Sequence, residues 1–305
     1  MAFMVVGLHA GFLGDFTPLG QYLAVNGIFR IAVPVFLIIN GFFFFSVVAN
    51  GSQVYWLKRV SILYVVWMLF YSYFWFSTPE LSLIGMAQLT QKIIIGYHHL
   101  WYLSGMVVAA IILLLLRHFS LCFLVSSTLV SFFVGVIIQY LGNYHYFEGG
   151  TLDMLFNEHW FHRNALFFSY PFFCIGYLIH KHSIHEKFDL KYVGIISALG
   201  VLLLLGESYL NYYQAGRDGG FDNYLSLILV CPFVFLLFIK LNISGNSKNI
   251  ALYSSAIYFI HSLLLSVLRR FTELEPTLLT VTVILTSIGV SYVIIKVNKR
   301  VKIIL

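Results

Sequence analysis

Ten long apolar stretches constrain the fold of this chain more than any other feature. They cover about residues 2–14, 27–48, 59–78, 100–117, 120–141, 165–180, 192–210, 223–239, 250–268 and 278–295. A membrane span needs about 20 mostly apolar residues, and lipid offers the backbone no hydrogen-bonding partner, so each span has to be a helix. Runs such as residues 111–116 lack the alternating polarity of a membrane β-strand. We therefore expect an all-α, polytopic membrane bundle of about ten transmembrane helices.

The composition agrees with this interpretation. Of 305 residues, 18 are Lys or Arg and 12 are Asp or Glu, whereas soluble domains carry about 25% charged residues. The mean hydropathy is +0.89. Ten spans use about 200 residues and leave about a hundred for the connections. We expect residues 1–305 to form a single membrane domain without a soluble domain, and we assign the net charge of +6 to loops rather than to nucleic-acid binding.

The first stretch is shorter than a span. It offers 13 residues, from Ala2 to Gly14, where about 20 are needed. It has neither the basic start nor the small-residue cleavage site of a signal peptide. We expect a first helix truncated at its N-terminus, with the native start upstream of Met1.

The basic residues predict the orientation. If the N-terminus is cytoplasmic and the ten spans alternate, twelve of the 18 Lys and Arg residues lie inside, as the positive-inside rule requires. Both termini are then cytoplasmic. The six remaining basic residues lie outside: Arg30, Lys92, Arg163, Arg217, Arg269 and Arg270.

Two histidines fall within apolar stretches. His9 has no charged neighbour before Asp15, and His261 lies in the middle of its stretch. Ionisable residues inside a membrane are costly and are functional candidates by default. Imidazole titrates near neutrality and suits a general base. The alternative role is a structural hydrogen bond between helices.

Further polar residues gather where the chain meets the outer face. Arg30 opens the second stretch, where it could either snorkel to the headgroups or serve a site. Asn40 and Gly41 lie deeper and indicate a close helix approach or a backbone break. The segment 98–102 (HHLWY) combines two histidines with aromatic rings that suit sugar stacking, although an interfacial aromatic belt has the same composition.

The loop 142–164 is the most polar part of the chain. Its His159 and His162 share the i, i+3 spacing of helical metal ligands, but no wider motif supports a metal, so we expect a solvated loop and no metal site. Cys122, Cys174 and Cys231 lie in apolar runs without paired spacing. The sequence contains no Walker loop, GxSxG, HExxH or Rossmann motif, which argues against an ATP-driven machine.

Five motifs in a fixed order carry a family resemblance. They are VVGLH (5–9), VPVF (33–36) with NGF (40–42), HLWYL (99–103), FFCIGYL (172–178) and SAIYFIH (255–261). Together they cover nearly the whole chain, which resembles the acyltransferase-3 family of integral membrane acyltransferases. Members of this family modify bacterial surface polysaccharides and related glycans.

Three departures from the family pattern accompany the match. The family pairs the first-helix histidine with an arginine eleven positions earlier, and this chain has only eight residues before His9. Asn40 stands where the family usually has Ser. A second arginine that the family places shortly after the position of Arg59 is absent, since Ile62 and Leu63 occupy that region.

The resemblance implies a function and a set of residues. It implies transfer of an acyl group, acetyl in the first instance, from cytoplasmic acyl-CoA to a hydroxyl of a surface polysaccharide, as in lipopolysaccharide O-antigen, or of its lipid-linked precursor, in the bacterial inner membrane. His9 would act as general base or, alternatively, form an acyl-histidine. Lys58 and Arg59 would bind the acyl-CoA phosphates, while Arg30, His99, Trp101 and Arg163 would bind the glycan.

A transporter is the main alternative. Ten helices with a polar interior could export a glycan or lipid-linked sugar instead of modifying it, and buried histidines suit both functions. A transporter does not account for the order of the five motifs, and no pair of interrupted half-helices occurs at corresponding positions. If His9 is not the base, His261 is the next candidate.

Overall fold

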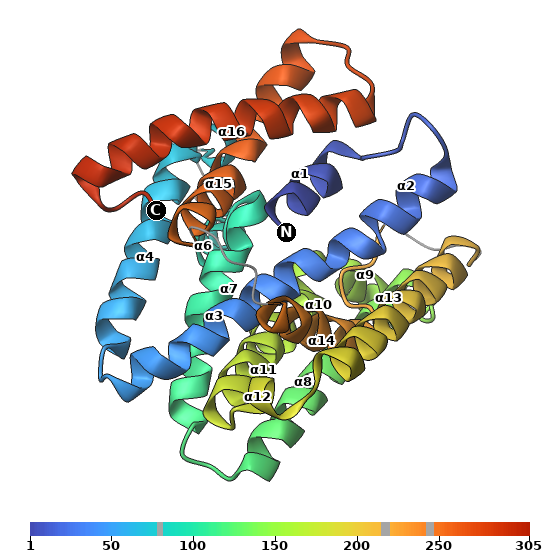
Figure 1. Ribbon diagram of the computed structural model, residues 1–305. Coiled ribbons are helices and arrows are strands. Elements are labelled where there is room, and N and C mark those ends of the chain that lie inside the picture. Colours follow the sequence, from blue (N-terminus) through green and yellow to red (C-terminus); the bar gives the residue numbers. More distant parts are fainter. Residues whose placement is uncertain (78–81, 215–219, 242–246) are drawn as a thin grey trace.

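The computed structural model describes residues 1–77, 82–214, 220–241 and 247–305, and its regular elements in these ranges are helices (Figure 1). Arg217 and residue 78 of the third predicted stretch lie outside the described residues. The helices are α1 (Ala2–Ala10), α2 (Pro18–Val25), α3 (Ala32–Ala49), α4 (Gln53–Phe70), α5 (Ser72–Trp75), α6 (Leu83–Ile95), α7 (Trp101–Leu116), α8 (Leu121–Asn143), α9 (Thr151–Asn157), α10 (His159–His162), α11 (Tyr170–Lys181), α12 (Ile184–Lys187), α13 (Leu190–Tyr212), α14 (Leu227–Lys240), α15 (Ser247–Phe271) and α16 (Pro276–Val301). Single turns η1 (Ile28–Ile31), η2 (His98–Leu100) and η3 (Ala165–Ser169) lead into α3, α7 and α11.

The expected all-α polytopic bundle is confirmed, because each of the ten apolar stretches coincides with helix. Among the described residues, six helical segments are long and apolar enough to cross a membrane unaided. They are Pro18–Ala49, His98–Leu116, Leu121–Asn143, Leu190–Tyr212, Lys248–Phe271 and Pro276–Val301. Helices α6 and α14 are apolar but shorter. Helix α6 was not among the expected stretches, because Gln88, Gln91 and Lys92 interrupt its apolar pattern.

Helices α3 and α11 cross with their backbones in direct contact. A Cβ atom added at Gly41 would lie 1.9 Å from the Phe173 carbonyl oxygen, and one at Gly176 would lie 2.0 Å from that of Ile38. Only glycine fits at such a crossing, as in tightly packed membrane helices. Helix α3 continues unbroken through this point. Of the two alternatives for Asn40 and Gly41, the structure therefore has the close approach.

Helix α1 lies against α15 and α16 (Figure 1). It ends at Gly11, whose φ of +82° is readily adopted only by glycine, and the Gly11 N–H caps the helix through the Gly7 carbonyl. Beyond the cap, the Leu13 N–H donates to Thr277 Oγ1 at 3.0 Å, and Asp15 Oδ1 accepts from the Thr277 N–H at 3.0 Å. These contacts fix the segment that follows α1, and with it His9, at the start of α16.

We expect Gly41→Ala to destabilise the protein, because the new methyl group overlaps backbone atoms of α11 that cannot rotate away. Overpacking typically costs about 1–3 kcal/mol of unfolding free energy. Thermal unfolding of the detergent-purified protein measures the effect. Gly289→Ala in α16 is the matched control, since nothing lies within 4 Å of its added Cβ. Equal melting temperatures for the two variants would contradict the contact.

Candidate functional site

Four histidine rings form a cluster, although they come from three separate parts of the chain. α1 contributes His9, η2 contributes His98 and His99, and α15 contributes His261. The ring centroid of His9 lies 4.5 Å from that of His98 and 5.4 Å from that of His261, which it stacks against. The His99 and His261 centroids are 5.0 Å apart. Such a concentration of imidazoles among apolar helices needs a functional explanation.

The surroundings of His261 fix its tautomer. Its Nδ1 lies 2.7 Å from the Tyr258 carbonyl oxygen and 3.2 Å from that of Ile257. A carbonyl only accepts hydrogen bonds, so Nδ1 carries the proton. In the neutral ring, Nε2 then holds a lone pair, and this atom is buried without a hydrogen-bond partner among the described residues. His261 therefore presents a free proton acceptor next to the ring of His9.

The segment that carries His98 and His99 has an unusual backbone. His98 has a φ of +47°, a left-handed conformation that residues other than glycine rarely adopt. His99 is buried, and both of its ring nitrogens lack a hydrogen-bond partner among the described residues. Its carbonyl accepts a hydrogen bond from the Tyr258 hydroxyl. Buried polar groups without partners and non-glycine residues with a left-handed backbone conformation concentrate at functional sites, where the surrounding fold holds them in place.

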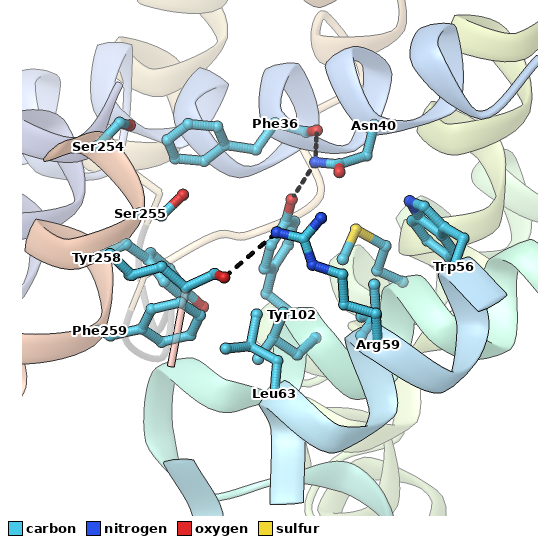
Figure 2. A pocket seen from close by; sticks show the side chains of 14 residues that line it. Phe36, Asn40, Trp56, Arg59, Leu63, Tyr102, Ser254, Ser255, Tyr258 and Phe259 are labelled. Atoms are coloured by element: carbon cyan, nitrogen blue, oxygen red, sulfur yellow. Dashed lines mark hydrogen bonds between the residues drawn. The ribbon is translucent and has the colours of Figure 1, made fainter. Parts of the chain in front are cut away.

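One cavity, the Arg59 cavity, opens between α3, α4, α7 and α15 and has a volume of about 280 Å³. Its polar lining consists of Asn40, Arg59, Tyr102, Ser254, Ser255 and Tyr258. Figure 2 shows the Arg59 guanidinium directed into it, toward the Asn40 and Tyr102 side chains. Asn40 donates to the Tyr102 hydroxyl at 2.8 Å and to the Phe36 carbonyl at 2.9 Å, and Arg59 donates to the Leu305 carbonyl at 3.3 Å.

A second cavity, the Trp101 cavity, has a volume of about 480 Å³. Its lining includes Lys92, His98, Trp101, His159, Trp160 and Arg163. The Arg163 guanidinium carbon lies 4.8 Å from the centroid of the Trp101 ring, which is a cation–π contact. This cavity therefore combines cationic side chains with aromatic faces.

The histidine cluster separates the two cavities. On one side, His98 lines the Trp101 cavity and contacts His9. On the other side, Tyr258 lines the Arg59 cavity, and its ring lies 5.2 Å from His99 and 6.1 Å from His261. A molecule in the Trp101 cavity would therefore contact His98 directly, and one in the Arg59 cavity would be separated from the imidazoles by the Tyr258 side chain.

Asp222 joins Arg30 and Arg163 into a buried ion cluster. Arg30 donates to Asp222 Oδ1, and Arg163 Nη1 donates to Asp222 Oδ2 at 2.9 Å. Arg30 also donates to Asn26 Oδ1 at 2.5 Å. Burial alone would raise the pKa of Asp222, but the two guanidinium groups outweigh it and hold that pKa below its ordinary range. The carboxylate is therefore ionised at neutral pH.

The candidate residues predicted from the sequence lie in different parts of the structure. His9 and His99 meet in the cluster, Trp101 and Arg163 line one cavity, and Arg59 lines the other. Lys58 is exposed and lines neither cavity, and Arg30 faces Asp222 instead of a cavity. Sequence reasoning gave no role to Asp222 or Tyr258, and it noted His98 only as the neighbour of His99. Within the described residues, no group of three or more His, Cys, Asp or Glu side chains is arranged to hold a metal ion.

Comparisons with known proteins agree with one another only in part. The family model described as an acyltransferase domain matches residues 1–296. A serine/alanine racemase of Enterococcus gallinarum is 25% identical over 287 residues, which are 85% of this chain and 39% of that protein. An amino-acid racemase of Enterococcus faecalis is 22% identical over 298 residues, which are 91% of this chain and 41% of that protein. The chain thus spans about two fifths of the length of these relatives. No solved structure matches it at a significant level.

We expect Asp222→Asn to destabilise the protein by about 3–5 kcal/mol, the usual cost of removing one partner from a buried ion pair. Because the folded-state pKa of Asp222 is depressed, its contribution is present above the unfolded pKa of about 3.9 and is lost only as pH falls below that value. The difference in melting temperature between wild type and variant should therefore be the same at about pH 7 and at about pH 4.5. The exposed Glu273→Gln is the control. A difference that vanishes at the lower pH would show that Asp222 is protonated there.

Proposed function

Since the chain belongs to the acyltransferase-3 family, we propose that it moves an acyl group, acetyl in the first instance, from cytoplasmic acyl-CoA to a glycan hydroxyl. The acceptor is a bacterial surface polysaccharide or its lipid-linked precursor, and the protein works in the inner membrane with both termini in the cytoplasm. The observation that carries this proposal is the histidine cluster between two cavities of different chemistry. Such an arrangement offers separate sites for two substrates with a candidate base beside both.

The Arg59 cavity is the proposed donor side. Acyl-CoA carries its acyl thioester at one end of a pantetheine arm and its phosphates at the other end, and this cavity has an aromatic and aliphatic wall with one guanidinium. Arg binds phosphate oxygens through paired hydrogen bonds. The hydroxyls of Tyr102 and Tyr258 and the amide of Asn40 are further polar groups that line this cavity.

The reaction uses His9 as general base. His9 takes the proton of the acceptor hydroxyl. The hydroxyl oxygen attacks the thioester carbonyl carbon, and a carbon–oxygen bond forms. When the carbon–sulfur bond breaks, the proton passes to the leaving sulfur, so that free CoA thiol and acylated glycan result. The neutral His261 ring stacks on His9 and offers its free Nε2 as a second proton acceptor. Attack of a histidine on the thioester, through an acyl-histidine, is the alternative route with the same products.

We expect His9→Gln to lower glycan acylation by about 10²–10⁴-fold, the usual contribution of a general base. Gln keeps hydrogen-bonding capacity but cannot titrate near neutrality. The acyl content of purified surface glycan, measured by mass spectrometry at equal membrane levels of protein, gives the result. His118→Gln is the matched control, because His118 is exposed and lies outside the cluster.

Two outcomes of this experiment would contradict the proposal. Near-normal acylation in His9→Gln would exclude His9 as the base and make His261 the next candidate. Unchanged acylation per glycan with reduced export of the glycan would favour the transporter.

The Arg59 cavity predicts a difference between two neighbouring cations. Arg59→Gln should raise the apparent KM for acyl-CoA by about tenfold, because a charge-assisted phosphate contact is lost, with little change in kcat. Lys58→Gln is the matched control, since Lys58 lines neither cavity. Titration of acyl-CoA at saturating acceptor measures both constants. Equal effects of the two substitutions would remove Arg59 from the donor site.

A further inference from the structure

The ion cluster beside the Trp101 cavity carries an excess positive charge. Arg30 and Arg163 share the single carboxylate of Asp222, so the three side chains together have a net charge of +1. At the cavity wall, Lys92 and Glu158 balance each other. Burial lowers the pKa of His159 and lowers that of His162 to about 4, so both rings are neutral at neutral pH. Among the residues that the structure describes, none of these side chains compensates the extra charge, and an uncompensated charge in a partly buried cluster is costly.

The cation that faces the cavity is Arg163. Its Nη1 is bonded to Asp222, and the other N–H groups of the guanidinium have no hydrogen-bond partner among the described residues. Asp222 on one side and the Trp101 ring on the other fix the plane of the guanidinium. A planar guanidinium held in this way is prepared for paired hydrogen bonds to a carboxylate or phosphate.

The aromatic rings of the same cavity suit a sugar. Trp101 and Trp160 both line it, and its volume of about 480 Å³ lies within the range of small-molecule sites. Trp101 contacts the Arg163 guanidinium, so an apolar ring face and the charged group are adjacent. A neutral sugar would use the rings but leave the charge without a counterion.

We propose that the Trp101 cavity binds a sugar that carries an anionic substituent, a phosphate or a carboxylate, with Arg163 as the partner of the anion. This inference rests on the proposed function and narrows it, because it makes the acceptor an anionic glycan unit and not a neutral one. Trp101 and Trp160 contact the sugar ring, and Lys92 is a second cation of the cavity wall that the anionic substituent can reach. Asp222 and Arg30 hold Arg163 in place and do not touch the ligand.

The test is a binding titration without acyl donor. Ligand-observed NMR with the detergent-purified full chain compares glucose 1-phosphate, glucuronate and glucose at low ionic strength. We expect one or both anionic sugars to bind about tenfold or more tightly than glucose, since charge-assisted hydrogen bonds are the stronger ones. Raised salt should reduce that advantage. The comparison between glucose 1-phosphate and glucuronate distinguishes phosphate from carboxylate.

Three variants test whether the anionic sugars bind in the Trp101 cavity. Arg163→Gln should remove the preference for the anionic sugars, and Lys92→Gln should reduce it without disturbing the bond between Arg163 and Asp222. Lys187→Gln, in the exposed α12, should leave it unchanged. Lys92→Gln keeps the test decisive if Arg163→Gln does not fold.

Two results would overturn the inference. One is equal affinity for glucose and for both anionic sugars; the other is a preference for anions that survives both Arg163→Gln and Lys92→Gln. If either result is found and the protein still acylates a neutral glycan, the inference fails while the proposed acyl transfer stands. If the anionic sugars bind but no acyl group is transferred, the proposed function fails and the binding site remains.

Discussion

The packing of α1 against α15 and α16 is the contact on which the candidate site depends. Helix α1 has nine residues, and an isolated helix of that length is unstable. Its position comes from its buried residues and from bonds at its end: Arg269 donates to the His9 carbonyl at 2.8 Å, and Thr277 donates to Asp15. The Arg269 bond is made to the His9 carbonyl itself and the Asp15 bond lies six residues further along, so together they hold the His9 imidazole against that of His261.

The same constraint gives the site its chemistry. Once α1 is in place, four imidazoles form one cluster, with His98 lining the Trp101 cavity and Tyr258 of the Arg59 cavity beside His99. His261 is fixed in one tautomer by backbone carbonyls of its own helix, which leaves a proton acceptor beside His9. The two cavities differ in the groups that they offer: a guanidinium with tyrosine hydroxyls in one, and indole rings with cations in the other. Each therefore suits a different substrate of the proposed transfer.

The sequence predicted ten helical stretches because hydrophobic length is a local property, and it missed the more polar or shorter helices α2, α6 and α9. His9 and His261 could be identified because an ionisable group stands out in an apolar run. The pairing of Arg30 with Asp222 could not be predicted, since the two residues are 192 positions apart and a loop conformation brings them together. Lys58 and Arg59 are adjacent on α4, and the hydrophobic pattern does not indicate which of them lines the cavity. For Asn40 and Gly41, sequence left two alternatives that only the position of α11 decides.

Transfer across the membrane of reconstituted vesicles can be measured for the purified protein. Purified protein is inserted into sealed vesicles with radiolabelled acetyl-CoA on one side and the glycan acceptor on the other, and the label on the glycan and the free CoA thiol are counted separately. The account predicts that label reaches the acceptor across the membrane in equal amount to the CoA released on the donor side, and that His9→Gln stops both. Passage of the unlabelled glycan across the membrane without release of CoA would contradict the account.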